Sequence, residues 1–520
     1  MQAFSREIEL KLVFDPADAG RLKRHLGRTF GRQARPRQTL VSVYFDTPDL
    51  RLHEAGISLR VRRIGRGMVQ TIKSVNGAAA GLFDRGEWEQ PINRAQPDLT
   101  AVQDTPLAPL LNGRGPEALR PVFETRVRRA VYQVAAEESV IAIAFDEGDV
   151  DTGQDCAPVS ELEFELLSGE SAELFRLART LTGVVPLRFA VQSKSDRGYA
   201  LMEGEPHPVA WASEVHLDPA MSCADAFRVI AHNGLRQLAA NEPAVREGRP
   251  NALHQMRIGL RRARAAMSLF RDIVGDSEHD RIKAGLKWLA GTLGPARDLD
   301  VFMADVLVPL RTEHPDHPGL ADICHDIEVR RLRAYADAVA ACCSDRYQAV
   351  LLDTMEWIES GPWRTGDDPL LRTRREQAIT ALAGDELARR RRKIIKGGRS
   401  LRDCSPEKRH ELRIRGKKLR YATEFFADAF PGKRNTRRRN AVLAALKDLQ
   451  EALGGLNDIA TREQLAEKIA AEGRGDEQAA RKRAFAAGMI VGRQHARHAE
   501  LLAAAERAYA NIADGKAYWS

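Results

Sequence analysis

EIELKLVF (Glu7–Phe14) is the stretch that decides how the first third of this 520-residue chain folds. Charged and apolar residues alternate along it, as they do in a strand with one apolar face. Glu7, Glu9 and Lys11 therefore point to one face, and the residues between them point to the other. The pattern predicts a strand that carries two carboxylates and one ammonium group on a single side.

Two later stretches repeat this alternation, with like charges two positions apart. SLRVRR (58–63) places Arg60 and Arg62 on one face, and ELEFEL (161–166) places three glutamates on one face. Carboxylate oxygens are ligands for Mg²⁺, and guanidinium groups bind phosphate oxygens. Together the stretches predict a site for a metal-complexed polyphosphate on the polar face of a sheet.

The polar face of this sheet has two possible environments. In an open sheet the charges are solvated, whereas in a closed barrel they line a tunnel and helices cover the apolar face outside. Like charges aligned on neighbouring strands repel by roughly tenths of a kcal/mol per pair unless a counter-ion separates them. The recurrence of Glu-x-Glu and of paired arginines favours the tunnel.

The length of the chain predicts two or three domains, and its composition changes once along the sequence. Residues 1–202 read as short strands, with helices expected at about 15–29 and 169–183. Gly204, Pro206 and Pro208 place a linker at 203–218. From residue 219 to about 510, alanine, leucine, arginine and glutamate with helical spacing predict an all-α domain.

The helical part repeats itself. HQMR (254–257) returns as HELR (410–413), and LGPARDLD (293–300) returns as LGGLNDIA (453–460). The spacing predicts an internal duplication, with repeats at about 219–370 and 371–510.

Each repeat carries a stripe of basic residues along one helix. The helical angle places the histidine and the cations three, seven and ten residues later within about 80° of one another. The stripes have three possible interpretations: their charges are solvated, they pair with Asp298 and Asp458, or they bind a polyanion. The presence of the stripe in both repeats favours a polyanion. The candidate residues are His254, Arg257, Arg261, Arg262 and Arg264 in the first repeat, and His410, Arg413, Lys417, Lys418 and Arg420 in the second.

Other sequence features indicate a cytoplasmic protein. The first residues lack the basic and apolar regions of a secretory signal, and no run of 18 apolar residues occurs. Six scattered cysteines show no zinc-ligand spacing. The net charge of +8 suits a polyanionic partner. The stripes lack interleaved aromatic residues, so sequence-specific nucleic-acid binding is not expected.

Residues 1–202 resemble the CYTH, or triphosphate tunnel metalloenzyme, family, because EIELK, SLRVRR, TIK, RGEWE, ELEFEL and QSK occur in the family's order. The resemblance implies an eight-stranded antiparallel β-barrel tunnel that hydrolyses triphosphates with Mg²⁺ or Mn²⁺. It implies catalytic roles for Glu7, Glu9 and Lys11. The implied metal ligands are Glu7, Glu9, Glu161, Glu163 and Glu165, and the implied phosphate-binding residues are Lys11, Arg60, Arg62, Lys73, Arg85, Arg126 and Lys194.

The duplicated HxxR and LGxxRD motifs resemble the CHAD family over residues 219–510. This resemblance implies two pseudo-symmetric helical bundles around a basic channel that binds inorganic polyphosphate. The second repeat departs from the pattern at Lys417 and Lys418, and at Asn457, where the first repeat has Arg297.

The two resemblances together imply hydrolysis of inorganic triphosphate to pyrophosphate and phosphate, with an appended polyphosphate-binding domain. A location at polyphosphate granules would be compatible with this activity. Alternatives are a non-catalytic polyphosphate-binding or targeting protein, and a tunnel enzyme acting on thiamine triphosphate or cyclising ATP.

Overall fold

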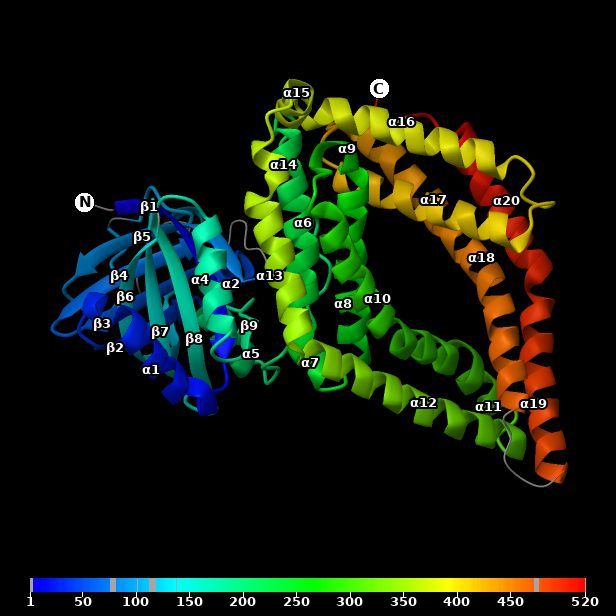
Figure 1. Cartoon of the computed structure of the whole chain (residues 1–520), viewed down its shortest axis with the longest axis horizontal. Helices are drawn as coiled ribbons and strands as arrows, with labels where there is room; N and C mark the ends of the chain where they lie inside the picture. The colour runs from blue at the N-terminus through cyan, green and yellow to red at the C-terminus, as the bar shows by residue number, and fades with distance from the viewer. Residues whose placement is uncertain are drawn as a thin grey trace. The chain divides into compact units, whose positions relative to one another are not determined.

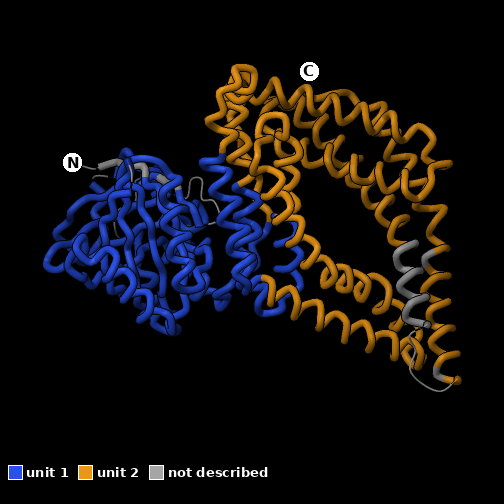
Figure 2. The backbone as a smooth tube through the Cα atoms, in the orientation of Figure 1, with its two compact units in different colours: residues 1–211, 232–259, 342–361 blue, residues 212–231, 260–341, 362–520 orange. Residues whose placement is uncertain are grey.

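A computed structural model of the chain describes residues 3–74, 81–100, 102–111, 118–136, 138–471 and 477–519. It divides into two compact units (Figure 2). The first contains residues 1–211, 232–259 and 342–361, and the second contains residues 212–231, 260–341 and 362–520. The first unit holds all the described strands together with the helical segments 232–259 and 342–361, and the second unit is helical. The described elements after residue 219 are helices, as the change of composition predicted, but the two compact units do not divide the chain at the predicted linker.

One curled antiparallel sheet of nine strands dominates the first unit (Figure 1). Strand β1 pairs with β8 and also with β5, so that β1 to β8 close into a ring. The predicted antiparallel tunnel is confirmed, and the three-residue β9 is an addition at the edge of β1. The strands are β1 (Ala3–Phe14), β2 (Gln38–Asp46), β3 (Ile57–Ile64), β4 (Gly67–Ser74), β5 (Leu82–Ile92), β6 (Arg120–Ala136), β7 (Ser139–Asp151), β8 (Cys156–Ser168) and β9 (Leu187–Phe189).

Short helices accompany the sheet. The expected helix at 15–29 is a 3₁₀ turn (η1, Pro16–Asp18) capped by Asp15, followed by α1 (Ala19–Phe30). The expected helix at 169–183 is α4 (Ala172–Thr182). The remaining elements are η2 (Gly31–Gln33), α2 (Arg51–Glu54), α3 (Ala108–Leu111) and α5 (Lys194–Met202).

Strand register separates the charged interior of the barrel from its apolar exterior. Lys11 lies opposite Glu163, and the alternating residues Leu10, Leu12 and Phe164 are buried on the other face. Helices α1 and α4 lie along this outer face (Figure 1). Apolar burial therefore holds the barrel closed from outside, and the interior is left to polar side chains.

Helices make up the rest of the described chain. None of them combines the length and the hydropathy needed to cross a membrane. They are α6 (Cys223–Ala240), α7 (Glu242–Arg246), α8 (Pro250–Leu269), α9 (Arg271–Val274), α10 (His279–Phe302), the π-helical turn η4 (Met303–Leu307), α11 (Val308–Glu313), α12 (Pro318–Cys342), α13 (Asp345–Ser360), α14 (Pro362–Thr365), α15 (Pro369–Glu376), α16 (Ile379–Gly398), α17 (Pro406–Phe425), α18 (Lys433–Ala471), α19 (Glu477–Ala496) and α20 (His498–Asp514).

The two helical repeats meet at equivalent residues of the second unit. Phe270 and Phe426 are 156 positions apart (426 − 270), the same spacing that separates His254 from His410. Their rings contact each other with centroids 6.1 Å apart. A contact between equivalent positions is what a pseudo-twofold arrangement of duplicated segments produces.

Candidate active site

A cavity of about 310 Å³ lies inside the barrel, within the size range of small-ligand sites. Most of the side chains that line it are charged or polar, unlike an ordinary protein core. Its acidic lining residues are Glu7, Glu9, Glu87, Glu89, Glu163 and Glu165, and its basic ones are Lys11, Arg35, Arg60, Arg62, Lys73, Arg129 and Lys194.

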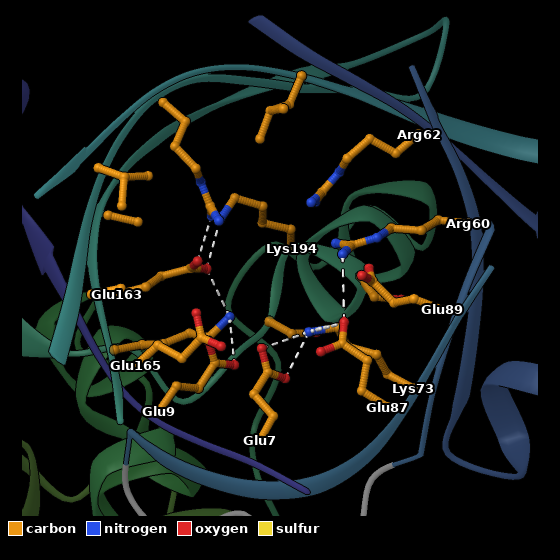
Figure 3. A pocket seen from close by; sticks show the side chains of 18 of the residues that line it. Glu7, Glu9, Arg60, Arg62, Lys73, Glu87, Glu89, Glu163, Glu165 and Lys194 are labelled. Atoms are coloured by element: carbon orange, nitrogen blue, oxygen red, sulfur yellow. Dashed lines mark hydrogen bonds and ion pairs between the residues drawn. The ribbon is translucent and has the colours of Figure 1, made fainter. Parts of the chain in front are cut away.

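The arginines of β3 lie apart from most of the acids of this cavity. Figure 3 shows Arg60 and Arg62 across the cavity from Glu9, Glu163 and Glu165. Strand β3 supplies the two arginines, and β1 and β8 supply most of the acids. The lysines of the cavity lie among the acids, with Lys73 close to Glu7 and Glu87, and Lys194 close to Glu163. A ligand that bridges the cavity would therefore contact guanidinium groups on one side and carboxylates with their lysines on the other.

One group of carboxylates, Asp146, Glu161 and Glu163, is neutralised by fixed cations. Oxygen atoms of all three lie within 4.8 Å of one another. The Lys194 ammonium lies 2.8 Å from Asp146 and 2.9 Å from Glu163, and it also contacts Glu161. Arg129 donates two hydrogen bonds to Asp146, of 2.6 and 2.8 Å. We call these three acids the neutralised trio.

Two members of the neutralised trio, Asp146 and Glu163, stay ionised although they are buried. Burial alone would raise the pKa of Asp146, but the charges of Lys194 and Arg129 outweigh it and hold the pKa below its usual value. Burial likewise opposes ionisation of Glu163, and Arg129 and Lys11 hold its pKa well below the usual range. The trio has oxygen ligands for a metal, but its charge is already balanced.

A second group of carboxylates, Glu7, Glu9 and Glu165, has less compensation. Lys73 lies 2.7 Å from Glu7, and Lys11 lies 3.1 Å from Glu9. Burial, followed by the charges of Glu7 and Glu9, raises the pKa of Glu165 to about 7. We call these three acids the open trio.

The open trio fits a hard divalent cation. Its donors are carboxylate oxygens, the ligands that Mg²⁺ and Mn²⁺ prefer. Burial first, and then the charges of Glu7 and Glu9, make ionisation of Glu165 unfavourable in spite of the nearby Lys73. A divalent ion would supply the missing positive charge.

At Arg62 it is positive charge that lacks a partner of opposite sign. Its Nε donates to the Ser42 hydroxyl at 3.0 Å, and no ion pair joins it to a carboxylate in the described part of the chain. Burial, and then the charges of Arg60 and Arg129, lower the pKa of Arg62 to about 9. A half-buried guanidinium group that faces two other guanidinium groups and a neutral partner indicates a missing anion.

Most of the predicted tunnel residues line the cavity, and among the described side chains Glu161 and Arg126 do not. Glu161 is fully buried behind the lining, where Lys194 and Arg197 bind it. The side chain of Arg85 lies outside the described residues, although its backbone pairs with Glu7. The predicted residues that do line the cavity are Glu7, Glu9, Lys11, Arg60, Arg62, Lys73, Glu163, Glu165 and Lys194.

The prediction that Arg126 faces the tunnel is wrong. Arg126 is exposed on the outside of the barrel and pairs with Glu124 at 3.1 Å. Its neighbour Arg129 lies three residues further along β6, on the inner face, and lines the cavity instead. ETRVRR contains arginines on both faces, and only the burial of Val127 between two exposed arginines distinguishes them.

Sequence analysis also missed two uncharged residues next to the arginines of the cavity. Tyr44 lines the cavity, and Ser42 accepts a hydrogen bond from Arg62. On β2 they lie directly opposite Arg60 and Arg62 of β3. Their alternation in LVSVYFD matches that of the arginines. Hydroxyl groups are common in strands, however, and nothing in the sequence marked these two.

The basic stripes lie on α8 and α17, and the structure assigns internal contacts to some of their members. Arg262 is buried, lies 5.5 Å from the centroid of the Phe425 ring and donates to the Ser213 carbonyl at 3.2 Å. His410 contacts the Asn457 side chain at 2.8 Å, and Arg420 pairs with Glu424 at 2.7 Å.

The other predicted stripe residues differ in exposure. Arg261 and Lys418 are exposed, which leaves their charged groups accessible to a ligand. The half-buried members are His254, Arg257, Arg264, Arg413 and Lys417. Polyphosphate binding at any of these positions stays a prediction.

Comparison with known proteins identifies two different families along the chain. An inorganic triphosphatase from Haemophilus influenzae is 32% identical over 202 residues, which cover 38% of this chain and 55% of that relative. The chain thus spans about half the length of the curated relative. The crystal structure of the CHAD domain from the plant Ricinus communis is 27% identical, with a TM-score of 0.51 over 60% of this chain and 98% of that chain. Residues 5–199 match the CYTH domain family and residues 229–467 match the CHAD domain family, so the chain consists of a CYTH domain followed by a CHAD domain.

Proposed function

We propose that the barrel hydrolyses inorganic triphosphate to pyrophosphate and phosphate, with Mg²⁺ or Mn²⁺ held by the open trio. The observation that carries the proposal is Arg62, a half-buried cation that faces the cavity without a carboxylate partner among the described residues. A phosphate chain would supply its missing anion. The similarity to an inorganic triphosphatase supports the same activity.

Different residues of the cavity would bind the phosphate chain and the metal. Arg60, Arg62 and Arg129 would hold phosphate oxygens, because guanidinium groups have donors only and match phosphate geometry. A divalent metal held by Glu7, Glu9 and Glu165 would neutralise charge on the phosphate chain and lower the pKa of water.

Hydrolysis requires no protein nucleophile in this arrangement. The oxygen of water forms a bond to the terminal phosphorus, the bridging P–O bond breaks, and pyrophosphate leaves. Glu9, a buried residue of the cavity lining, would orient that water. Positioning and fixed charge would supply most of the acceleration, as in other phosphoryl transfers.

Phosphate release from tripolyphosphate, ATP and thiamine triphosphate, each with Mg²⁺ or with a chelator, tests this proposal. We expect metal-dependent release, fastest from tripolyphosphate. Arg62→Ala should lower kcat/KM by about 100-fold or more, because it removes a buried charged contact. Arg126→Ala, the same change on the outside of the barrel, is the matched control and should have no effect. Preference for an organic triphosphate, or equal activity of both variants, would contradict the proposal.

We further propose that the helical domain binds inorganic polyphosphate through the stripes on α8 and α17. The match to the CHAD family and the exposure of Arg261 and Lys418 support this. Binding that replaces condensed counter-ions with ion pairs weakens steeply as salt rises, as for nucleic-acid phosphates.

Long-chain polyphosphate binding by the full chain, measured across a salt series, tests the second proposal. Changing Arg257, Arg261 and Arg264 together to alanine should weaken binding and reduce the logarithmic salt slope by about 2. Changing Arg24, Arg28 and Arg32 on the β-domain removes the same charge and should leave the slope unchanged. An unchanged slope in the first variant, or displacement by duplex DNA at equal phosphate concentration, would reject polyphosphate as the ligand.

A further inference from the structure

Tyr44 lies at the end of the cavity beside α5. It is 3% exposed and lines the cavity from near the C-terminal end of β2. Strand register places it opposite Arg60 on one side and Phe123 on the other. Its ring stacks on Phe123 with centroids 4.7 Å apart, which fixes the direction in which the phenol group points.

The wall behind Tyr44 is closed and tightly packed. Tyr199 of α5 contacts Phe123 edge-on at 5.1 Å and donates a 2.8 Å hydrogen bond to the buried Asp46. Gly198 lies so close to Phe123 that an added Cβ would be 2.3 Å from its ring. Tyr44, Phe123 and Tyr199 belong to one apolar cluster with Val127, Val150 and Val159. A ligand therefore cannot displace Tyr44 at this end of the cavity unless the side chains of the cluster repack.

The phenol group of Tyr44 lies among cations. Burial would raise the pKa of Tyr44, but Arg60, Arg62 and Lys194 outweigh that effect and lower it. Arg60 lies directly opposite Tyr44 on β3, and its guanidinium group can only donate hydrogen bonds. In the described part of the chain we find no acceptor for the phenol proton.

The cations that act on Tyr44, which are Arg60, Arg62 and Lys194, are all hydrogen-bond donors, although Glu87 approaches Arg60 to 3.9 Å. A phosphoryl group has acceptor oxygens only, so it complements such a wall, whereas a hydroxyl or amide ligand would leave donors unpaired. The end of a phosphate chain carries more such oxygens than an internal phosphate does. The wall therefore suits a chain end.

We propose that Tyr44 contacts the innermost phosphate of the substrate and, backed by Phe123 and Tyr199, acts as the stop that fixes which phosphoanhydride bond lies at the metal. The inference rests on the proposed triphosphatase function. The phenol O–H donates a hydrogen bond to a phosphoryl oxygen. The aromatic wall prevents the phosphate chain from moving further inward. A chain is then bound by its end, and its excess length extends away from α5.

Two substitutions separate the hydrogen bond from the wall. Tyr44→Phe keeps the ring and removes the donor, so kcat/KM for tripolyphosphate should fall by about 10-fold or more. The products from tetrapolyphosphate, either phosphate plus triphosphate or two pyrophosphates, should keep their wild-type ratio. Tyr44→Ala removes the stop, and the ratio should change because the chain can shift by one phosphate.

The same measurements on Tyr132→Phe provide the control, because Tyr132 is a buried tyrosine of β6 outside the cavity lining. That variant should match the wild type in both rate and product ratio. If Tyr44→Phe also matches the wild type, the proposed contact is refuted, and this result stands even if Tyr44→Ala does not fold. If wild-type protein releases no phosphate from tripolyphosphate, the triphosphatase proposal fails instead.

Discussion

The neutralised trio of Asp146, Glu161 and Glu163 and the open trio of Glu7, Glu9 and Glu165 occupy the same barrel. They share ligand chemistry but differ in their counter-charges. Lys194 and Arg129 balance the first group through several short contacts. In the second group, burial and then the charges of Glu7 and Glu9 raise the pKa of Glu165 to about 7.

This difference shows that proximity of carboxylates does not by itself identify a metal site. The neutralised trio has the closer ligand geometry, yet an ammonium group already lies among its oxygens. A metal ion would have to displace that group and leave it buried without a partner, which is costly. Unbalanced charge on hard oxygen donors is the better indicator, and it points to the open trio.

The largest expected effect concerns catalysis by the open trio. Glu9→Gln removes a hard ligand and should abolish turnover of tripolyphosphate at ordinary Mg²⁺ concentrations while the fold remains intact. Glu7→Gln should behave in the same way. Turnover and thermal unfolding of each variant, compared with Glu124→Gln on the outer surface, check this. Wild-type turnover in either variant would remove that residue from the metal site.

The next largest effect concerns the stability of the neutralised trio. Lys194→Met removes the shared ammonium group and leaves three buried carboxylates with less compensation, so unfolding in denaturant with a chelator should show a loss of about 3 kcal/mol. Divalent metal should then stabilise this variant more than it stabilises the wild type, because the trio becomes available as ligands. If Lys194→Met is as stable as the wild type, the trio is not held together by its fixed cations.

The alternation of charge in the sequence was enough to predict the strands and the polar interior of the barrel. EIELK and ELEFEL place Lys11 opposite Glu163, as two strands with inward charges require. It was not enough to predict that Glu161 is buried behind the cavity lining, because its partner Lys194 lies on a helix 33 residues further along the chain. Contacts made across such a distance leave no periodic trace in the sequence.

Arg126 and the stripe of α8 illustrate the same limit. ETRVRR carries arginines on both faces of β6, and the pairing of Arg129 with Asp146 on β7 decides which one is inside. In the helical part, the repeated motifs predicted the duplication, and the contact of Phe270 with Phe426 agrees with it. The internal role of Arg262 depends on a ring from the other repeat, which helical spacing cannot show.

The smallest expected effect is a dependence of stability on pH that belongs to the open trio. The folded pKa of Glu165, about 7, lies above its unfolded value of about 4.3. Between these values the folded chain binds more protons than the unfolded chain, so the Glu165 contribution to stability falls as pH rises through this window. Mg²⁺ binds the ionised form, and its stabilising effect should therefore be larger at pH 8 than at pH 5.5. Melting curves at both pH values, with Mg²⁺ or a chelator, should show this as a difference of a few degrees that Glu165→Gln removes and Glu124→Gln retains. An equal effect of Mg²⁺ at both pH values would mean that the metal binds away from Glu165, and the contrast between the two trios would lose its basis.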